Sequence, residues 1–189
     1  KPTKQSPQPP FTTSTLQQEA ARKLGFSVSQ TMMVAQQLYE AGLITYMRTD
    51  SVNLSTFALG MAKEVISKEY GEEYLKLRNF TTKTKGAQEA HEAIRPTNLS
   101  LTEIKGDNYQ RRLYSLIYKR MIASQMSDAK IEKTNIDIEI SNDKDNYFSS
   151  KAEVILFDGY LKVYSVSVDE DDEENNDGSS ANRLPKIKE

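Results

Sequence analysis

The chain has 189 residues, of which 37% are hydrophobic and 28% charged, and it contains no cysteine. These values are typical of a globular protein with one or two modest domains, and they exclude disulfides and cysteine-ligated zinc. No apolar run is long enough to span a membrane and no basic-then-apolar leader is present, so we expect a cytoplasmic protein without a membrane partner.

The formal net charge of −2 hides an uneven distribution. Residues 169–189 hold eight of the 27 acidic and three of the 25 basic residues. Residues 1–168 therefore hold 19 acids and 22 bases and carry a formal charge of +3. A mild positive charge suits contact with DNA phosphates, although a roughly neutral surface fits the value equally well.

Residues 1–10 contain four of the six prolines, which predicts an extended connector. The chain opens on a lysine, and we expect it to be part of a longer protein.

Two short helices are expected next. Ser14 or Thr15 caps the first, and Ser27 or Ser29 caps the second, which ends at Gly42. Two short helices, a tight turn and a following extended segment are typical of a winged helix-turn-helix. Two ordinary packed helices are the simpler interpretation of the same pattern.

Two more helices follow a polar turn. Ser55 caps one that ends at residues 70–71, and Asp107 with Gln110 caps the other. Between them, residues 72–88 are polar and predict a surface loop whose lysines face either solvent or DNA phosphates. The basic side chains of the last helix are best interpreted as a solvated face.

After Asp128 the apolar period changes from helical to two, which predicts strands. We expect a turn at residues 141–146, then two strands at residues 151–157 and 160–168. Asp158-Gly159 between these strands is a strong hairpin signal. Residues 169–180 read as an acidic loop.

The segment at residues 42–51 reads GLITYMRTDS and contains the most distinctive chemistry. In an extended run, Ile44, Tyr46 and Arg48 share one face while the residues between them face the other way. A phenol is a poor nucleophile at its free pKa of about 10, but a nearby cation favours the phenolate. Arginine also binds phosphate through bidentate hydrogen bonds, so Tyr46 and Arg48 together are suited to attack on a phosphodiester.

Three segments together resemble one family. Residues 42–51, the QEAHEAIRPT run at residues 88–97 and the PFTTSTLQQ run at residues 10–18 are similar to segments of bacterial type IA DNA topoisomerases, in the same order. The resemblance covers most of residues 10–130. Met47 stands where proline is usual in the topoisomerase III branch. This residue and the HEAIRPT motif favour the topoisomerase I branch over a topoisomerase III or reverse gyrase fragment.

The resemblance implies an α+β fold in which a helical, winged-helix-like (CAP-like) domain is inserted in a β-rich arch domain. Residues 1–10 would then be a connector or arch strand, and residues 11–130 the helical domain carrying the tyrosine. Residues 131–168 would be a further piece of the arch, and residues 169–189 the acidic loop and the start of the next segment.

The resemblance also implies a mechanism. Tyr46 would cleave single-stranded DNA by forming a 5′-phosphotyrosine bond, so that strand passage relaxes negative supercoils without ATP. Arg48 would neutralise the phosphate as charge builds on it. His91 would hydrogen-bond the same phosphate, and Asp50 would orient Arg48 or cap the following turn. Arg95 would either bind phosphate or brace its turn.

The family binds Mg²⁺ in a separate N-terminal domain that nothing in this sequence resembles, and no residue here is predicted to bind metal. We therefore expect a monomeric, nucleoid-associated piece of an isomerase that is inactive alone. Its expected partners are single-stranded or negatively supercoiled DNA and the remaining domains of the polypeptide. The alternative is a winged-helix DNA- or protein-binding module in which Tyr46 is merely packed.

Overall fold

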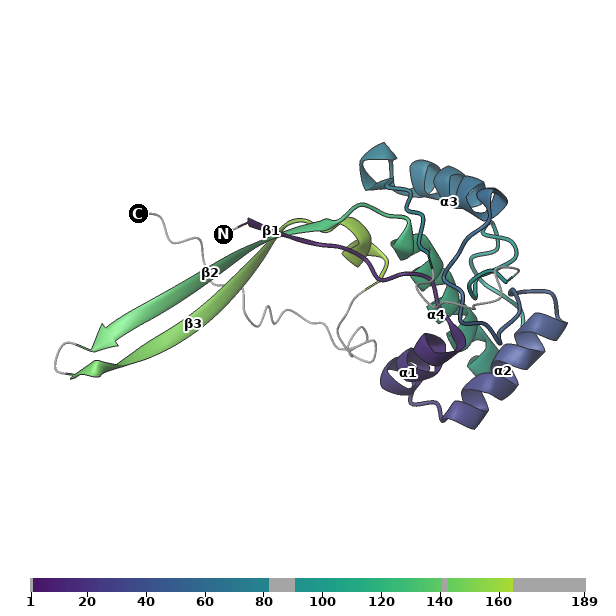
Figure 1. Ribbon diagram of the computed structural model, residues 1–189, viewed down its shortest axis with the longest axis horizontal. Helices are drawn as coiled ribbons and strands as arrows, with labels where there is room; N and C mark the ends of the chain where they lie inside the picture. The colour runs from purple at the N-terminus through teal and green to yellow at the C-terminus, as the bar shows by residue number, and fades with distance from the viewer. Residues whose placement is uncertain (1, 82–90, 141–142, 165–189) are drawn as a thin grey trace.

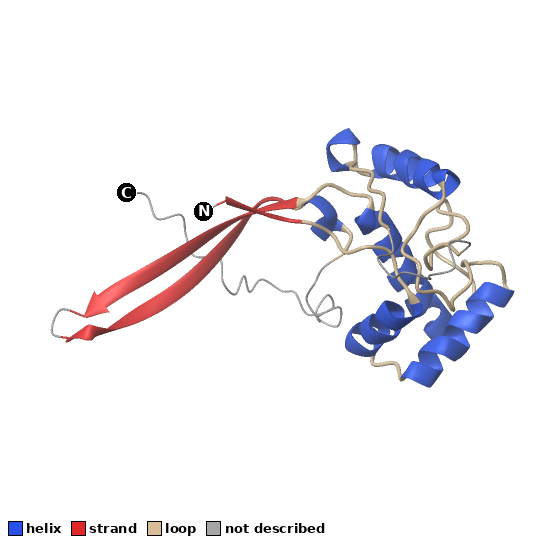
Figure 2. Ribbon diagram, in the orientation of Figure 1, coloured by secondary structure: helices blue, strands red, loops and turns tan. Residues whose placement is uncertain are grey.

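The computed structural model describes residues 2–81, 91–140 and 143–164 as a lobe of helices from which a long β-hairpin projects (Figure 1). The helices gather at one end of the molecule and the strands at the other (Figure 2). The mixture of helices and a small antiparallel sheet confirms the predicted α+β class. Within the described residues, no helix is both long and apolar enough to cross a bilayer.

A capping side chain starts each helix. Ser27, Ser55 and Asp107 accept hydrogen bonds from the first turns, as predicted. The prediction for the first helix was wrong, because Thr12 rather than Ser14 or Thr15 is the cap. Thr12 has the extended backbone that a cap requires, and it forms a reciprocal capping box with Thr15. The helices are α1 (Thr13–Leu24), α2 (Val28–Glu40), α3 (Thr56–Glu69) and α4 (Asn108–Ser124).

The helix α4 is the centre of the lobe and packs against α1, α2 and α3. Most of its residues from Leu113 onward are buried. Two of its tyrosines also tie down the preceding loop, since the hydroxyls of Tyr114 and Tyr118 donate to the carbonyls of Leu101 and Leu99 at 2.7 and 3.1 Å. A short 3-10 turn, η1 (Glu72–Tyr74), follows α3.

The sheet has the order β1-β2-β3, with both pairs antiparallel. Its strands are β1 (Pro2–Gln5), β2 (Ala129–Ile140) and β3 (Asp143–Phe157). The register pairs Thr3 with Ile131 and Ile131 with Ile155, so the first residues of the chain join a strand more than 120 residues away. β3 forms an outer edge, and its residues Val154, Ile155 and Leu156 are all exposed.

The predicted turn at residues 141–146 was too long, its residues 141–142 lie outside the described residues, and the predicted hairpin at Asp158-Gly159 was wrong. β3 already begins at Asp143, and the chain after it forms a 3-10 helix, η2 (Gly159–Lys162). Gly159 has a φ of 53°, and an added Cβ there would lie 2.5 Å from the carbonyl oxygen of Ser127. The glycine therefore permits a close backbone approach rather than a hairpin turn.

Several expectations concern parts of the chain outside the described residues. These are the lysines of the loop at residues 82–90, the end of the predicted last strand at residues 165–168, and the acidic loop with the following segment at residues 169–189.

Candidate active site

An open groove of about 700 Å³ lies between the first turn of α1, residues 46–50 and His91. Four of the five predicted site residues, Tyr46, Arg48, Asp50 and His91, line this groove. The fold thus brings the GLITYMRTDS and HEAIRP segments together although they are more than 40 residues apart. We call this concavity the Tyr46 groove; its other lining residues are Thr12, Thr13, Ser14 and Thr49.

The segment at residues 44–51, which we call the nucleophile segment after the role predicted for Tyr46, displays Tyr46, Arg48 and Asp50 by alternation. Tyr46, Arg48 and Asp50 are exposed, and Met47 and Thr49 between them are buried. This agrees with the prediction that Tyr46 and Arg48 share a face and that the residues between them face the other way. The prediction that Ile44 continues the exposed row was wrong, because Ile44 is 1% exposed. The segment makes only an isolated bridge, between Ile44 and Pro96, so no continuous ladder imposes a period of two across Thr45.

The helix α1 holds one side of the nucleophile segment through Thr13. The Thr13 hydroxyl donates to the carbonyls of Met47 and Thr49 at 2.8 and 3.1 Å and accepts from the Thr49 amide at 2.8 Å. The Thr13 amide also donates to the Thr49 carbonyl at 2.9 Å. The backbone on both sides of Arg48 is therefore fixed, while its side chain points away exposed.

The HEAIRP segment, residues 91–96, holds the other side through Thr45. The Thr45 amide donates to the Arg95 carbonyl at 2.9 Å, and the Thr45 hydroxyl donates to the Ala93 carbonyl at 2.7 Å. The Arg95 amide donates back to the Thr45 hydroxyl at 3.0 Å. These bonds place His91 and Tyr46 on neighbouring segments.

Arg95 is the predicted site residue that does not line the Tyr46 groove. Its guanidinium is buried and donates to the Glu92 carboxylate from Nε at 3.1 Å and from an Nη at 2.5 Å, and to the Pro96 carbonyl at 2.9 Å. Glu92 also accepts from the amide of Ser55, the cap of α3. Of the two roles left open for Arg95, these contacts are those of a brace.

The Glu92 carboxyl has a lowered pKa in this position. Burial raises its pKa, but hydrogen bonds from Ser55 and Arg95 outweigh burial and leave the pKa below the ordinary value. Glu92 therefore stays ionised at neutral pH and keeps the charge of buried Arg95 compensated.

Two rings flank the Tyr46 ring. The His91 ring lies at 6.0 Å between centroids, and the Tyr39 ring meets Tyr46 edge to face at 5.2 Å and 65°. Tyr39 was not singled out in the sequence. The signal available was its place in the last turn before the reversal at Gly42.

Among the groove side chains, Thr13 and Thr49 are hydrogen-bonded, but Tyr46 and Arg48 have no hydrogen-bond or ion-pair partner within the part of the chain that the structure describes. There, the Tyr46 hydroxyl has no protein hydrogen bond, and no ion pair joins Arg48 to Asp50. A phenol and a guanidinium that share a groove without internal partners can both reach a phosphate group placed between them. The catalytic and binding roles predicted for these residues stay predictions.

Nothing in the described residues fits a divalent metal. No three His, Asp or Glu side chains among them gather closely enough to hold an ion.

A family model for DNA topoisomerase matches residues 1–189 of this chain. The chain belongs to the DNA topoisomerase family. The predicted resemblance to bacterial topoisomerase I is therefore confirmed.

Individual relatives agree. A prokaryotic-type DNA topoisomerase 1 of Acanthamoeba polyphaga mimivirus is 50% identical over 184 residues, which is 93% of this chain and 22% of that protein. DNA topoisomerase 1 of Zymomonas mobilis is 47% identical over 190 residues, covering 100% of this chain and 16% of that protein. The chain thus spans about a quarter or less of the topoisomerases it matches.

A solved structure of full-length topoisomerase I from Thermotoga maritima has the same arrangement, with a TM-score of 0.76 and 40% identity. The similarity covers 88% of this chain and 28% of that one. The mixed helical and antiparallel architecture is therefore that of one part of a topoisomerase I.

Proposed function

We propose that Tyr46 is the nucleophile of a type IA DNA topoisomerase, within a longer polypeptide that includes this chain. The Tyr46 oxygen would attack a backbone phosphorus of single-stranded DNA, forming an O–P bond while the bond to the 3′ oxygen breaks. The product would be a 5′-phosphotyrosine and a 3′ hydroxyl, so the proton lost by the phenol balances the proton gained by the leaving oxygen. Since the bond energy is retained, reversal needs no ATP.

The observation that carries this proposal is the shared groove of Tyr46, Arg48, Asp50 and His91 in a chain of the topoisomerase family. Arg48 would meet the non-bridging oxygens as charge builds on phosphorus, and His91 would donate to the same phosphate. Asp50 would orient Arg48 once DNA has entered the groove. Arg95, by contrast, supports the site through Glu92.

The rest of the polypeptide would supply what this chain does not offer. We infer that it brings the Mg²⁺ site and the proton donor for the 3′ oxygen, and that the assembled, monomeric enzyme relaxes negatively supercoiled DNA. We also infer that residues 11–130 are a winged-helix-like insertion in an arch domain. In support, β1 and β2, which flank the helices in sequence, pair in one sheet. A cytoplasmic, nucleoid-associated location stays a prediction.

The test is trapping of the covalent intermediate. The full-length protein is incubated with Mg²⁺ and a single-stranded oligonucleotide labelled at its 3′ end, the end that a 5′-phosphotyrosine retains. The mixture is then denatured and analysed for a protein–DNA adduct. We expect an adduct that maps to Tyr46 and disappears in Tyr46→Phe. Noncovalent binding without any adduct would instead support the alternative of a DNA-binding module.

The same proposal predicts that the 189-residue chain alone does not relax plasmid DNA, since its described residues contribute the nucleophile but no cluster of metal ligands. If the purified chain relaxed plasmid DNA with Mg²⁺, the proposal that the rest of the polypeptide supplies the metal site would be wrong.

A further inference from the structure

The contact between Tyr39 and Tyr46 is built by the chain reversal after α2. The Gly42 amide donates to the Tyr39 carbonyl at 2.8 Å, and the Leu43 amide donates to the Leu38 carbonyl at 2.9 Å. Gly42 has a φ of 71°, a left-handed conformation that ends the helix and turns the chain back. Tyr46 therefore returns alongside the last turn of α2, where Tyr39 lies.

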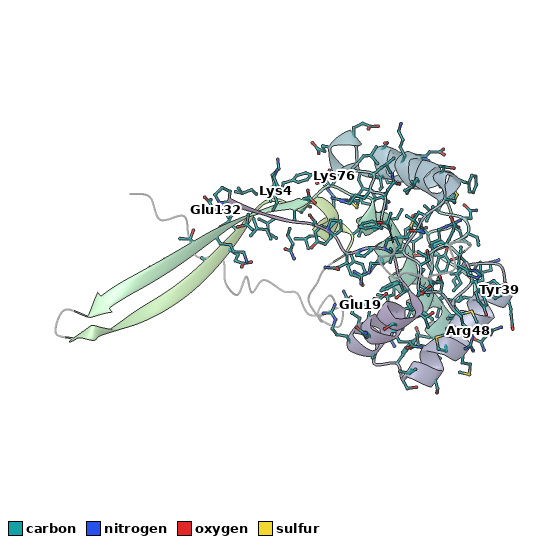
Figure 3. All side chains as sticks on the ribbon, viewed as in Figure 1. Lys4, Glu19, Tyr39, Arg48, Lys76 and Glu132 are labelled. Carbon is teal, nitrogen blue, oxygen red and sulfur yellow. The ribbon has the colours of Figure 1, made fainter. Side chains whose placement is uncertain are left out.

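The reversal is also tied to the HEAIRP side of the site. The Thr97 hydroxyl donates to the Gly42 carbonyl at 2.7 Å, and the Thr97 amide donates to the Leu43 carbonyl at 3.0 Å. Tyr39 thus sits on a fixed helix end beside a fixed loop. In Figure 3, Tyr39 and Arg48 lie at the same end of the helical lobe, away from the hairpin.

The direction of the Tyr46 side chain depends on ring contacts. The backbone of the nucleophile segment is fixed by Thr13 and Thr45, but the Tyr46 hydroxyl has no hydrogen bond within the described residues. The side chain is 39% exposed, so packing closes off only part of its rotational space. The rings of Tyr39 and His91 both lie close to the Tyr46 ring, and they limit how far the phenol can swing.

We propose that Tyr39 is a positioning residue for the nucleophile, holding the Tyr46 ring in the orientation from which its oxygen reaches DNA. This inference rests on the proposed function. An edge-to-face aromatic pair favours one arrangement of the two rings, and misplacing a reacting group lowers the rate without weakening substrate binding. Tyr39 acts through its ring, so its own hydroxyl is dispensable.

The experiment compares variants of the full-length enzyme in single-turnover cleavage of an oligonucleotide, with DNA affinity measured separately. For Tyr39→Leu we expect the rate of adduct formation to fall by about two- to tenfold. This is the rate change that corresponds to the interaction energy of one aromatic pair. The dissociation constant for DNA should not change. Tyr39→Phe should restore the wild-type rate, because it keeps the ring.

Tyr109 offers a matched control. It is also an exposed tyrosine in edge-to-face contact with another ring, Phe26, at 5.6 Å and 64°, but it does not line the Tyr46 groove. Tyr109→Leu should leave the cleavage rate unchanged. If Tyr39→Leu unfolds, Tyr39→Met keeps an unbranched helix-forming side chain without a ring and should show the same slower cleavage.

Two results would overturn the inference while the proposed function stands. One is a wild-type cleavage rate in the ring-less Tyr39 variants, and the other is a loss confined to DNA affinity, which would make Tyr39 a DNA contact. A wild-type enzyme that forms no adduct at all would overturn the proposed function and this inference together.

Discussion

The nucleophile segment and the junction between α4 and β2 are both irregular stretches of chain, but they use their polar side chains differently. At the junction, which comprises residues 74–78 and 124–128, charged side chains add to the backbone hydrogen bonds from Lys76 to Gln125 and from Ser127 to Tyr74. Arg78 donates to the Asp128 carboxylate at 2.7 Å and to the carbonyls of Ser124 and Met126, and Lys76 pairs with the same carboxylate.

In the nucleophile segment the backbone is fixed, and within the described residues the side chains of Tyr46 and Arg48 have no hydrogen bond. Thr13 binds carbonyls and an amide of the segment, and Thr45 binds the backbone of Ala93 and Arg95, while Tyr46 and Arg48 remain exposed. The difference teaches that the backbone of a groove can be held in place while Tyr46 and Arg48, the side chains of the proposed chemistry, stay exposed. It also separates residues whose loss should unfold the protein from residues whose loss should only inactivate it.

The largest effect on stability is expected at the junction. Asp128→Asn leaves Arg78 and Lys76 without their counter-charge, so the free energy of unfolding should fall by about 2–3 kcal/mol. Urea denaturation followed by circular dichroism measures this loss. An unchanged denaturation midpoint would show that the backbone hydrogen bonds of the junction hold it without the charge of Asp128.

The junction should also be sensitive to acid. Burial raises the pKa of Asp128, but hydrogen bonds from Lys76, Ser6 and Arg78 outweigh it and hold the pKa at about 2. Because this folded-state pKa lies below the ordinary value of about 3.9, the stabilisation is complete above that pH and is lost as the pH falls toward 2. The stability difference between wild type and Asp128→Asn should shrink over that range.

A smaller effect is expected at the threonine that fixes the nucleophile segment. Thr13→Val keeps the shape of the side chain but removes three hydroxyl hydrogen bonds, so the free energy of unfolding should fall by about 1–2 kcal/mol. In the full-length enzyme, adduct formation should slow as well, since the backbone around Arg48 is released. Thr13→Ser retains the hydroxyl and should recover both properties.

The smallest effect on stability is expected at Arg48. Because its side chain is exposed, Arg48→Ala should change the free energy of unfolding by no more than about 0.5 kcal/mol. Adduct formation by the full-length enzyme should nevertheless drop sharply. A large loss of stability in this variant would break the distinction between the two regions.

Local signals in the sequence predicted the parts of the fold that local chemistry decides. Ser27, Ser55 and Asp107 cap helices because each stands before an apolar pattern of helical period. The cap of α1 was displaced because Thr12, Thr13, Ser14 and Thr15 are four hydroxyl residues in succession, and only the fold selects among them. The hairpin predicted at Gly159 was wrong for a related reason. This glycine permits a close approach to the backbone of Ser127, which lies 32 positions earlier.

The site was predictable in its motif residues and not in its support. Tyr46, Arg48, Asp50 and His91 were found through the resemblance, and the fold brings them to one groove. Thr13, Thr45 and Tyr39 act through contacts to distant backbone or to a ring seven positions away, which no sequence period records. The buried pairing of Arg95 with Glu92 likewise becomes visible only once the turn at Pro96 is folded.

The outer edge of the sheet has a practical consequence for anyone handling this chain in isolation. β3 runs for 15 residues, and three successive apolar side chains, Val154, Ile155 and Leu156, stand exposed on it. Along this edge no further strand is paired in the described part of the chain, so its amides and carbonyls are open to a second molecule. Concentrated samples should therefore self-associate through strand addition, and dilute solutions or a charged substitution at Ile155 should keep them dispersed.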